Sequence, residues 1–327
     1  MIASPPNPGH LPVMRDEVVA ALQPRSDARF IDATFGGGGH SARLLELSEP
    51  DGMVLAIDAD PAAGERAETI LSGLDDRSRL RLVQANFSDI DTVARSQGFT
   101  DVDGILFDLG LSSFQLDDPE RGFAFRTDGP LDMRMDPTTH PSAAELIATI
   151  DEDSLVRLLR EYGEEPRARQ IARAIVRERE QTPIVSTAQF AALIERAVGG
   201  RRGAKTHPAT QTFQAVRIAV NRELESIARG VRDAIGLLKP GGRLVTIAFH
   251  SLEDRLVKRI IQDESATCIC PPGTPICICG VTPRLRRVGG SRKPTSDEIA
   301  HNPRARSAIM RIAERLPDAS SPPGEVK

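Results

Sequence analysis

Short apolar runs alternate with helical stretches over the first third of the chain. Residues 29–34 are typical of a short buried strand, and the four glycines after Phe35 lead into a helix from about His40 through Leu47. The same alternation predicts strands at 53–57, 79–83 and 104–107 and a helix at 61–71. Strands that alternate with helices predict an α/β fold with a mostly parallel sheet and right-handed crossovers.

The pattern changes after Asp108. Residues 116–140 are rich in Asp, Arg, Pro and Gly with little periodicity, whereas residues 143–199 predict several helices. We interpret this part as an inserted helical domain. The predicted organisation is a first part of the α/β domain at 1–113, the inserted domain at 114–209 and a second part of the α/β domain at 210–327.

The sheet pattern resumes in the last third. Apolar residues at steps of three and four predict one long helix with a stripe that packs against the core. These residues are Phe213, Val216, Val220, Leu224, Ile227, Val231, Ile235 and Leu238. The helix should end at a Lys-Pro-Gly-Gly turn at 239–242, which leads into a strand at 243–249, and a last strand is expected at 307–312.

The composition is that of a globular protein. The chain has 327 residues, of which 40% are hydrophobic and 27% charged, enough for one large and one smaller domain. Apolar residues never run together over about 18 positions, and residues 1–10 have no apolar stretch with basic flanks. We therefore expect a cytoplasmic protein without a membrane segment.

The charge is unevenly distributed along the chain. The formal net charge of −4 argues against a protein that coats nucleic acid non-specifically. Residues 281–311 are nevertheless strongly basic and contain only Asp297 and Glu298 as acids. The basic residues are Arg284, Arg286, Arg287, Arg292, Lys293, Arg304, Arg306 and Arg311. This basic strip is either an RNA-facing surface or a solvated one.

The glycines at 36–39 lie where a strand turns into a helix, the place where an open parallel sheet binds ligands. Glycine lets the backbone approach a ligand closely. Asp58, at the end of the next strand and about 20 residues further on, is placed to bind ribose hydroxyls. This spacing indicates an adenosine cofactor, but it does not separate NAD from S-adenosylmethionine.

Three features favour S-adenosylmethionine. The glycines crowd together without the third, spaced glycine of a dinucleotide fingerprint. Asp108 ends the fourth strand, so a carboxylate projects at the carboxyl edge of the sheet, where a sulfonium and an acceptor amine would meet. The turn at 239–242 resembles one that is frequent in class I methyltransferases.

Motifs across nearly the whole chain resemble the bacterial 16S rRNA (cytosine-N4)-methyltransferase family, RsmH, formerly MraW. Two of these motifs are too specific for a match of fold alone. They are the long acidic and arginine-rich block at 115–136 and the Phe-His-Ser-Leu-Glu-Asp-Arg sequence at 249–255. The segments that carry the resemblance are 10–14, 32–41, 108–113, 115–136, 207–210, 213–217, 249–255 and 302–307.

The resemblance implies a class I S-adenosylmethionine-dependent methyltransferase domain with an inserted helical domain. It implies methylation of the N4 amino group of cytidine 1402 in 16S rRNA, so that the partner is the rRNA or the small ribosomal subunit. A homodimer is left open. The cofactor contacts implied by the family are Gly38, Gly39, His40, Asp58, Phe87, Asp108 and Gln115.

Two residues are candidates for catalysis. The N4 lone pair of cytidine is delocalised into the ring, so attack on the methyl group needs a group that accepts the amine hydrogens, and Asp108 is the best candidate. His250, after the strand at 243–249, either shuttles a proton or makes a structural hydrogen bond. The usual aromatic residue after the fourth strand is missing, which leaves Phe114, Phe123 and Phe125 as candidates to hold the base.

All four cysteines, Cys268, Cys270, Cys277 and Cys279, lie in one short Pro-Gly segment. In a reducing cytosol such a cluster points to metal before disulfide. The Cys-x-Cys pairs depart from the usual Cys-x2-Cys zinc spacing. A structural zinc and free thiols in a peripheral loop both stay open, and we assign no metal ligand.

Three other functions fit parts of the sequence. A small-molecule methyltransferase is the main alternative, although the large insertion and the basic strip count against it. A nucleotide-dependent oxidoreductase would share the glycine turn and Asp58. A nucleic-acid-binding module without enzymatic activity would use the cysteines and the basic strip and would leave the glycine turn merely structural.

Overall fold

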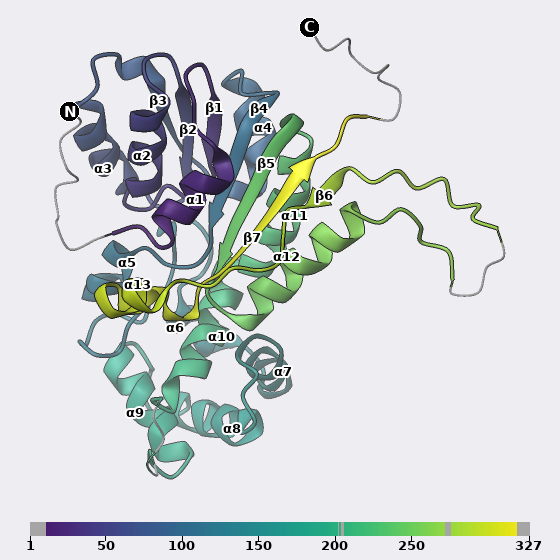
Figure 1. Cartoon of the computed structure of the whole chain (residues 1–327). Helices are drawn as coiled ribbons and strands as arrows, with labels where there is room; N and C mark the ends of the chain where they lie inside the picture. The colour runs from purple at the N-terminus through teal and green to yellow at the C-terminus, as the bar shows by residue number, and fades with distance from the viewer. Residues whose placement is uncertain (1–10, 202, 204–205, 272–275, 319–327) are drawn as a thin grey trace, which may run out of the picture. The chain divides into compact units, whose positions relative to one another are not determined.

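The structure, a computed structural model, describes residues 11–201, 203, 206–271 and 276–318 (Figure 1). The chain forms two compact units. The first takes the described residues up to Gly110 and from Leu224 onward, and the second takes those of Leu111–Glu223. Within these described ranges, none of the helices combines the length and the apolar character that crossing a bilayer requires.

The first unit is built on a seven-stranded sheet in the order β3-β2-β1-β4-β5-β7-β6. The first five strands of this order run parallel, and β7 and β6 are antiparallel additions. The strands are β1 (Arg29–Asp32), β2 (Met53–Asp58), β3 (Leu80–Gln84), β4 (Val102–Asp108), β5 (Leu238–Ala248), β6 (Leu285–Arg287) and β7 (Ile309–Arg315). The predicted mostly parallel α/β sheet is confirmed, and only the short β6 was not predicted.

Successive residues of a strand point to opposite faces of the sheet. Because both faces of this sheet are apolar, helices cover both of them. Phe30 packs into one apolar cluster together with α1, α2 and α3, and its neighbour Ile31 packs into the other with α4, α11 and α12. These helices are α1 (Arg15–Leu22), α2 (Gly39–Leu47), α3 (Ala63–Leu71), α4 (Ile90–Ser96), α11 (Glu223–Ile235) and α12 (Ser251–Glu264). The shorter elements are η1 (Arg77–Arg79), η2 (Phe87–Asp89), α13 (Ser296–His301) and η4 (Pro303–Ser307).

The predicted turn at 239–242 is a bulge inside β5. Leu238 pairs with Val102, whereas Arg243 already pairs with Gly104, so β5 carries three more residues than β4 over this stretch. Gly241 has a φ of 81°, which glycine adopts without steric cost. The strand therefore starts earlier than expected, and the Lys-Pro-Gly-Gly sequence widens it locally.

The second unit is helical, as predicted. Its apolar core is formed mainly by α7, α8, α9 and α10, with Leu159, Ile175, Phe190 and Phe213 among the buried residues. The elements are α5 (Ser113–Asp117), η3 (Pro119–Arg121), α6 (Ala143–Thr149), α7 (Glu152–Gly163), α8 (Ala168–Arg179), α9 (Thr187–Ala197) and α10 (Ala209–Asn221). This core is separate from the two clusters of the sheet.

The prediction of one long helix over 213–238 is wrong. The chain leaves the helical conformation at Arg222, whose φ of 48° and ψ of 41° are left-handed, and the two pieces are α10 and α11. Phe213 and Val216 join the helical core, whereas Val231 joins a cluster of the sheet. Apolar residues spaced by three and four positions predict a helix with one apolar face. The spacing does not show that the two halves of that face pack into different cores.

Both boundaries between the two units differ from the predicted ones, and the second differs because the predicted long helix is broken. The predicted insertion ends at Ala209, whereas α10 packs against α7, α6 and α9 and the boundary between the two units falls between Glu223 and Leu224. The first boundary, between Gly110 and Leu111, lies three residues before the predicted one.

The left-handed residue gives a prediction for stability. A side chain in this conformation costs roughly 1 kcal/mol, so Arg222→Gly should raise the free energy of unfolding by up to that amount. Arg222→Val should lower the free energy of unfolding, because a β-branched side chain tolerates positive φ worst. Urea unfolding followed by circular dichroism measures both changes. Equal effects of the two substitutions would show that the conformation of Arg222 does not limit stability.

Candidate active site

Acidic side chains lie at the carboxyl ends of three neighbouring strands of the first unit. Asp32 ends β1, Asp58 ends β2 and Asp108 ends β4. β2 and β3 lie on one side of β1 in the sheet, whereas β4 and β5 lie on its other side, so the order of the strands reverses between β1 and β4. The crevice at such a reversal is where open α/β sheets bind ligands.

The glycine turn joins β1 to α2. Gly38 has a φ of 75°, and a Cβ atom there would lie 2.4 Å from Ile70 Cδ1 and 2.6 Å from Phe35 Cζ. A Cβ atom on Gly39 would lie 3.0 Å from Pro12 Cγ. In the described part of the chain no side chain caps the start of α2, so its first backbone N–H groups remain available to a ligand.

Asp58 is fixed by the backbone of the turn. Its Oδ2 accepts a hydrogen bond from the Gly36 N–H at 2.7 Å, and its Oδ1 accepts one from the Asp60 N–H at 2.9 Å. Burial raises the pKa of Asp58 to about 6, although these two hydrogen bonds act in the opposite direction. A carboxylate has about four acceptor sites, so Asp58 retains acceptors for ligand hydroxyls.

Asp108 is held at the tip of β4 by Thr34. The Asp108 N–H donates to Thr34 Oγ1 at 2.6 Å, and His40 Nε2 lies 3.6 Å from Asp108 Oδ2. Asp108 Oδ1 is buried and accepts no hydrogen bond from the described residues. A buried acceptor without a donor is costly and is the arrangement expected where a ligand supplies the donor.

Asp32 supports the turn from below. Its Oδ2 accepts from Ser41 Oγ at 2.6 Å and its Oδ1 accepts from the Thr34 N–H at 3.2 Å. Asp32 is fully buried, and this burial raises its pKa. Thr34 and Ser41 were not singled out from the sequence. The only signal was the position of their hydroxyls two and nine residues after Asp32, which shows a contact only once the turn is folded.

Phe87 and Gln115, which only the family resemblance implied, have defined places. Phe87 is half-buried after β3 and its ring meets that of Phe107 edge-on, with centroids 5.7 Å apart. Gln115 belongs to the second unit, where its Oε1 accepts from the Ser112 N–H in the capping box of α5. Their contacts with a cofactor stay predictions.

His250 caps a helix. Its Nδ1 accepts from the Glu253 N–H at 3.4 Å, its Nε2 lies 3.0 Å from Glu253 Oε1, and Glu253 Oε2 accepts from the His250 N–H. This capping box fixes the start of α12 just after β5. Both ring nitrogens thus face Glu253, as the structural interpretation expects, and the role in proton transfer stays a prediction.

Of the three candidate base-holding aromatics, two pack within the helical unit. Phe123 is buried in its core, and the ring of Phe125 lies 4.7 Å from those of both His207 and Phe213. Phe114 is half-exposed. The role of each of the three in holding a base stays a prediction.

The basic strip is partly neutralised by acids from elsewhere in the chain. Arg284 pairs with Glu264, Arg286 with Glu314 and Arg311 with Asp254. Linear sequence could not show these pairs because the acids lie on α12 and β7. The exposed remainder of the strip is Arg287, Arg292, Lys293, Arg304 and Arg306.

The chain is similar to known proteins over nearly its whole length. The model of the MraW methylase family matches residues 7–316. Ribosomal RNA small subunit methyltransferase H of Thermomicrobium roseum is 55% identical over 94% of both chains. The protein of the same name from Geobacter sulfurreducens is 49% identical over 94% of this chain and 99% of its own. A solved rRNA methylase from Streptococcus thermophilus is similar at a TM-score of 0.40 and 12% identity over 97% of this chain and 99% of that chain.

A family match over nearly the whole length, together with relatives of about half identical sequence, leaves no ambiguity about descent. The chain belongs to the MraW methylase family.

Proposed function

We propose that the protein methylates the N4 amino group of cytidine 1402 in 16S rRNA. The chain is a methylase that uses S-adenosylmethionine, and its relatives are named for methylation of small-subunit ribosomal RNA. The observation that carries the proposal is Asp108 Oδ1, a buried acceptor without a donor among the described residues. It lies where the order of the strands in the sheet reverses.

The first unit offers groups that suit each part of the cofactor. Gly38 and Gly39 leave room for close approach, and the uncapped start of α2 suits a carboxylate. Asp58 would accept hydrogen bonds from the ribose hydroxyls, and Phe87 would cover one side of the adenine. The bound cofactor supplies a methyl group that its positive sulfur already activates, so no metal is required for the transfer.

Asp108 would act on the acceptor amine. Its free oxygen accepts an N–H of the cytidine amine, which draws the nitrogen lone pair out of conjugation with the ring and aims it at the methyl group. Transfer breaks the sulfur–methyl bond, forms the nitrogen–methyl bond, leaves the cofactor as a neutral thioether and releases one proton from nitrogen to solvent. The Thr34 hydrogen bond fixes Asp108 for this task, so catalysis rests on positioning and local electrostatics.

The alternative is a methyltransferase for a small molecule. The two functions differ in what accepts a labelled methyl group in vitro. We expect purified protein to label 16S rRNA or small subunits from an unmodified strain and to yield N4-methylcytidine on digestion. Labelling of free nucleosides or other small molecules alone would contradict the proposal. We further propose that the protein acts in the cytoplasm, and a homodimer stays a prediction.

The role of Asp108 is tested by Asp108→Asn. This change keeps the shape but weakens the acceptor, so the rate of methyl transfer should fall by about 10²–10⁴-fold. Asp101→Asn is the matched control because Asp101 is exposed at the opposite end of β4 in a left-handed conformation that Asn tolerates. A rate for Asp108→Asn within a few-fold of the control, in correctly folded protein, would remove Asp108 from the reaction.

The role of Asp58 is tested by pH. Because burial raises its pKa to about 6, Asp58 loses its charge as the pH falls through 6. If only the carboxylate binds ribose, affinity for S-adenosylmethionine should be about tenfold weaker at pH 5 than at pH 7.5. Calorimetric titration suits this protein, which has no Trp for fluorescence. Asp58→Asn should bind weakly at both pH values, whereas the exposed α3 variant Glu65→Gln should follow the wild type. An unchanged pH dependence in Asp58→Asn would assign the titration to another group.

A further inference from the structure

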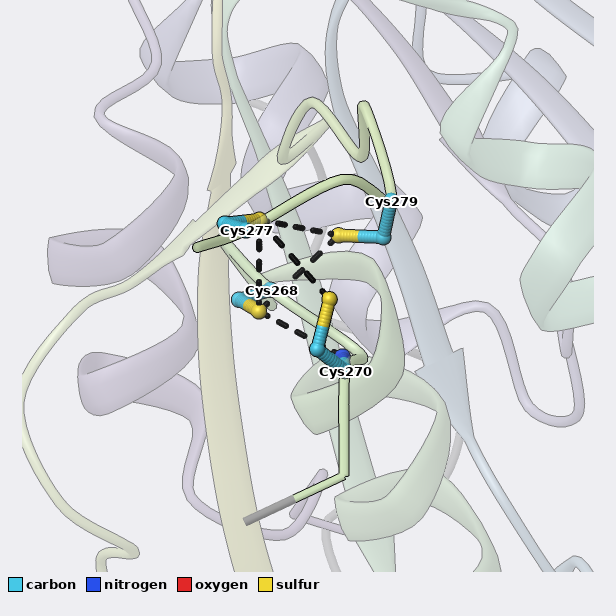
Figure 2. A group of neighbouring side chains, drawn as sticks. All are labelled: Cys268, Cys270, Cys277 and Cys279. Carbon is cyan, nitrogen blue, oxygen red and sulfur yellow. Dashed lines mark hydrogen bonds between the residues drawn. The ribbon is translucent and has the colours of Figure 1, made fainter. Parts of the chain in front are cut away.

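The connection between α12 and β6 contains all four cysteines of the chain and lies outside the proposed reaction. Its described residues form neither helix nor strand, and it runs away from the sheet (Figure 1). Its base is closed by Arg284, whose N–H donates to the Glu264 carbonyl at 2.8 Å. Away from this base, the sulfur atoms of the four cysteines face one another (Figure 2).

The distances between the sulfur atoms are those of a metal site. Cys277 Sγ lies 3.4 Å from Cys279 Sγ, 3.5 Å from Cys268 Sγ and 3.9 Å from Cys270 Sγ, and the sulfurs of Cys279 and Cys268 are also 3.9 Å apart. All six pairs lie within 4.8 Å. Zinc–sulfur bonds of about 2.3 Å in a tetrahedron place sulfurs about 3.8 Å apart, whereas a disulfide needs about 2.05 Å.

The apolar residues of the connection point the wrong way for a loop closed by hydrophobic packing. Ile269, Ile276 and Ile278 alternate with the cysteines and are 69%, 76% and 85% exposed. Burying one such side chain contributes about 1.5–3 kcal/mol, so a loop that folded around its own apolar residues would turn them inward. The four sulfur atoms face one another instead, although Cys268 and Cys277 are exposed and Cys270 and Cys279 only partly buried, so the cluster requires another source of stabilisation.

Backbone N–H groups support the sulfur atoms. The Cys270 N–H donates to Cys268 Sγ at 3.3 Å. The backbone N–H groups of Ile269 and Val281 donate to Cys279 Sγ. Hydrogen bonds of this kind orient the ligand atoms of metal sites.

We propose that Cys268, Cys270, Cys277 and Cys279 bind one Zn²⁺ ion in a tetrahedral site. Four thiolates select zinc among the redox-inert divalent ions, and a site with four protein ligands leaves no position for substrate, so the ion is structural. Binding displaces the thiol protons into solvent. The ion closes the connection near its tip, while Arg284 and Glu264 close it at its base. This proposal does not depend on the methyl-transfer function.

The first test is the metal content of full-length protein purified under reducing conditions without chelator. Elemental analysis should find about one zinc ion per chain in the wild type and in Ile276→Ser/Ile278→Ser, the matched control in the same segment. Cys277→Ser/Cys279→Ser should lose at least nine tenths of the zinc. Zinc well below one per chain in the wild type, iron in its place, or equal zinc in the cysteine variant would each overturn the proposal.

A second test needs no variant and holds even if the cysteine variant fails to fold. Metal-free wild-type protein titrated with Co²⁺ should develop intense thiolate-to-cobalt absorption and the visible bands of tetrahedral cobalt, saturating at one ion per chain. Zn²⁺ should then abolish both sets of bands. In parallel, a thiol reagent should modify all four cysteines of the metal-free protein rapidly and those of the zinc-loaded protein slowly. No thiolate-to-cobalt absorption, or equal thiol reactivity with and without zinc, would contradict the site.

Discussion

The hydrogen bond from the Asp108 N–H to Thr34 Oγ1 joins the ends of β4 and β1 at the point where the order of the sheet reverses. After β1 the chain continues toward β2, and after β4 it continues on the other side of the sheet. The loops that follow the two strands therefore separate and leave a crevice at the carboxyl edge. The 2.6 Å bond fixes the position of Asp108 relative to the glycine turn. The proposed geometry of both cofactor and acceptor amine therefore depends on it.

The site gathers carboxyl groups at some cost in stability. Asp32 and Asp58 both have raised pKa values because burial disfavours their charged forms. The backbone N–H groups of Gly36 and Asp60 and the Ser41 hydroxyl offset part of this penalty. A fold that only needed a tight turn would not require these acids. Acidic groups gathered at one edge of the sheet suit a polar, positively charged ligand.

Much of the architecture could be predicted from the sequence because strand-to-helix alternation is a local signal. The six longer strands, the glycine turn, Asp58 and Asp108 follow from periodicity and spacing. The break at Arg222 could not be predicted, because it depends on which core each half of the apolar stripe joins. Similarly, the pairing of Arg311 with Asp254 and the capping contacts of His250 with Glu253 arise from tertiary or turn geometry. The cysteines were visible in the sequence, but only their folded geometry favours metal over free thiols.

The proposed reaction is defined by which atom of which nucleotide receives the methyl group. The most direct measurement is mass-spectrometric mapping of 16S rRNA, at single-nucleotide resolution, from a strain that lacks this protein and from the same strain with the gene restored. We expect one cytidine to lack a methyl group on N4 in the first strain and to regain it in the second. An identical modification pattern in the two strains, or a methyl group restored on another base or on ribose, would contradict the proposed reaction.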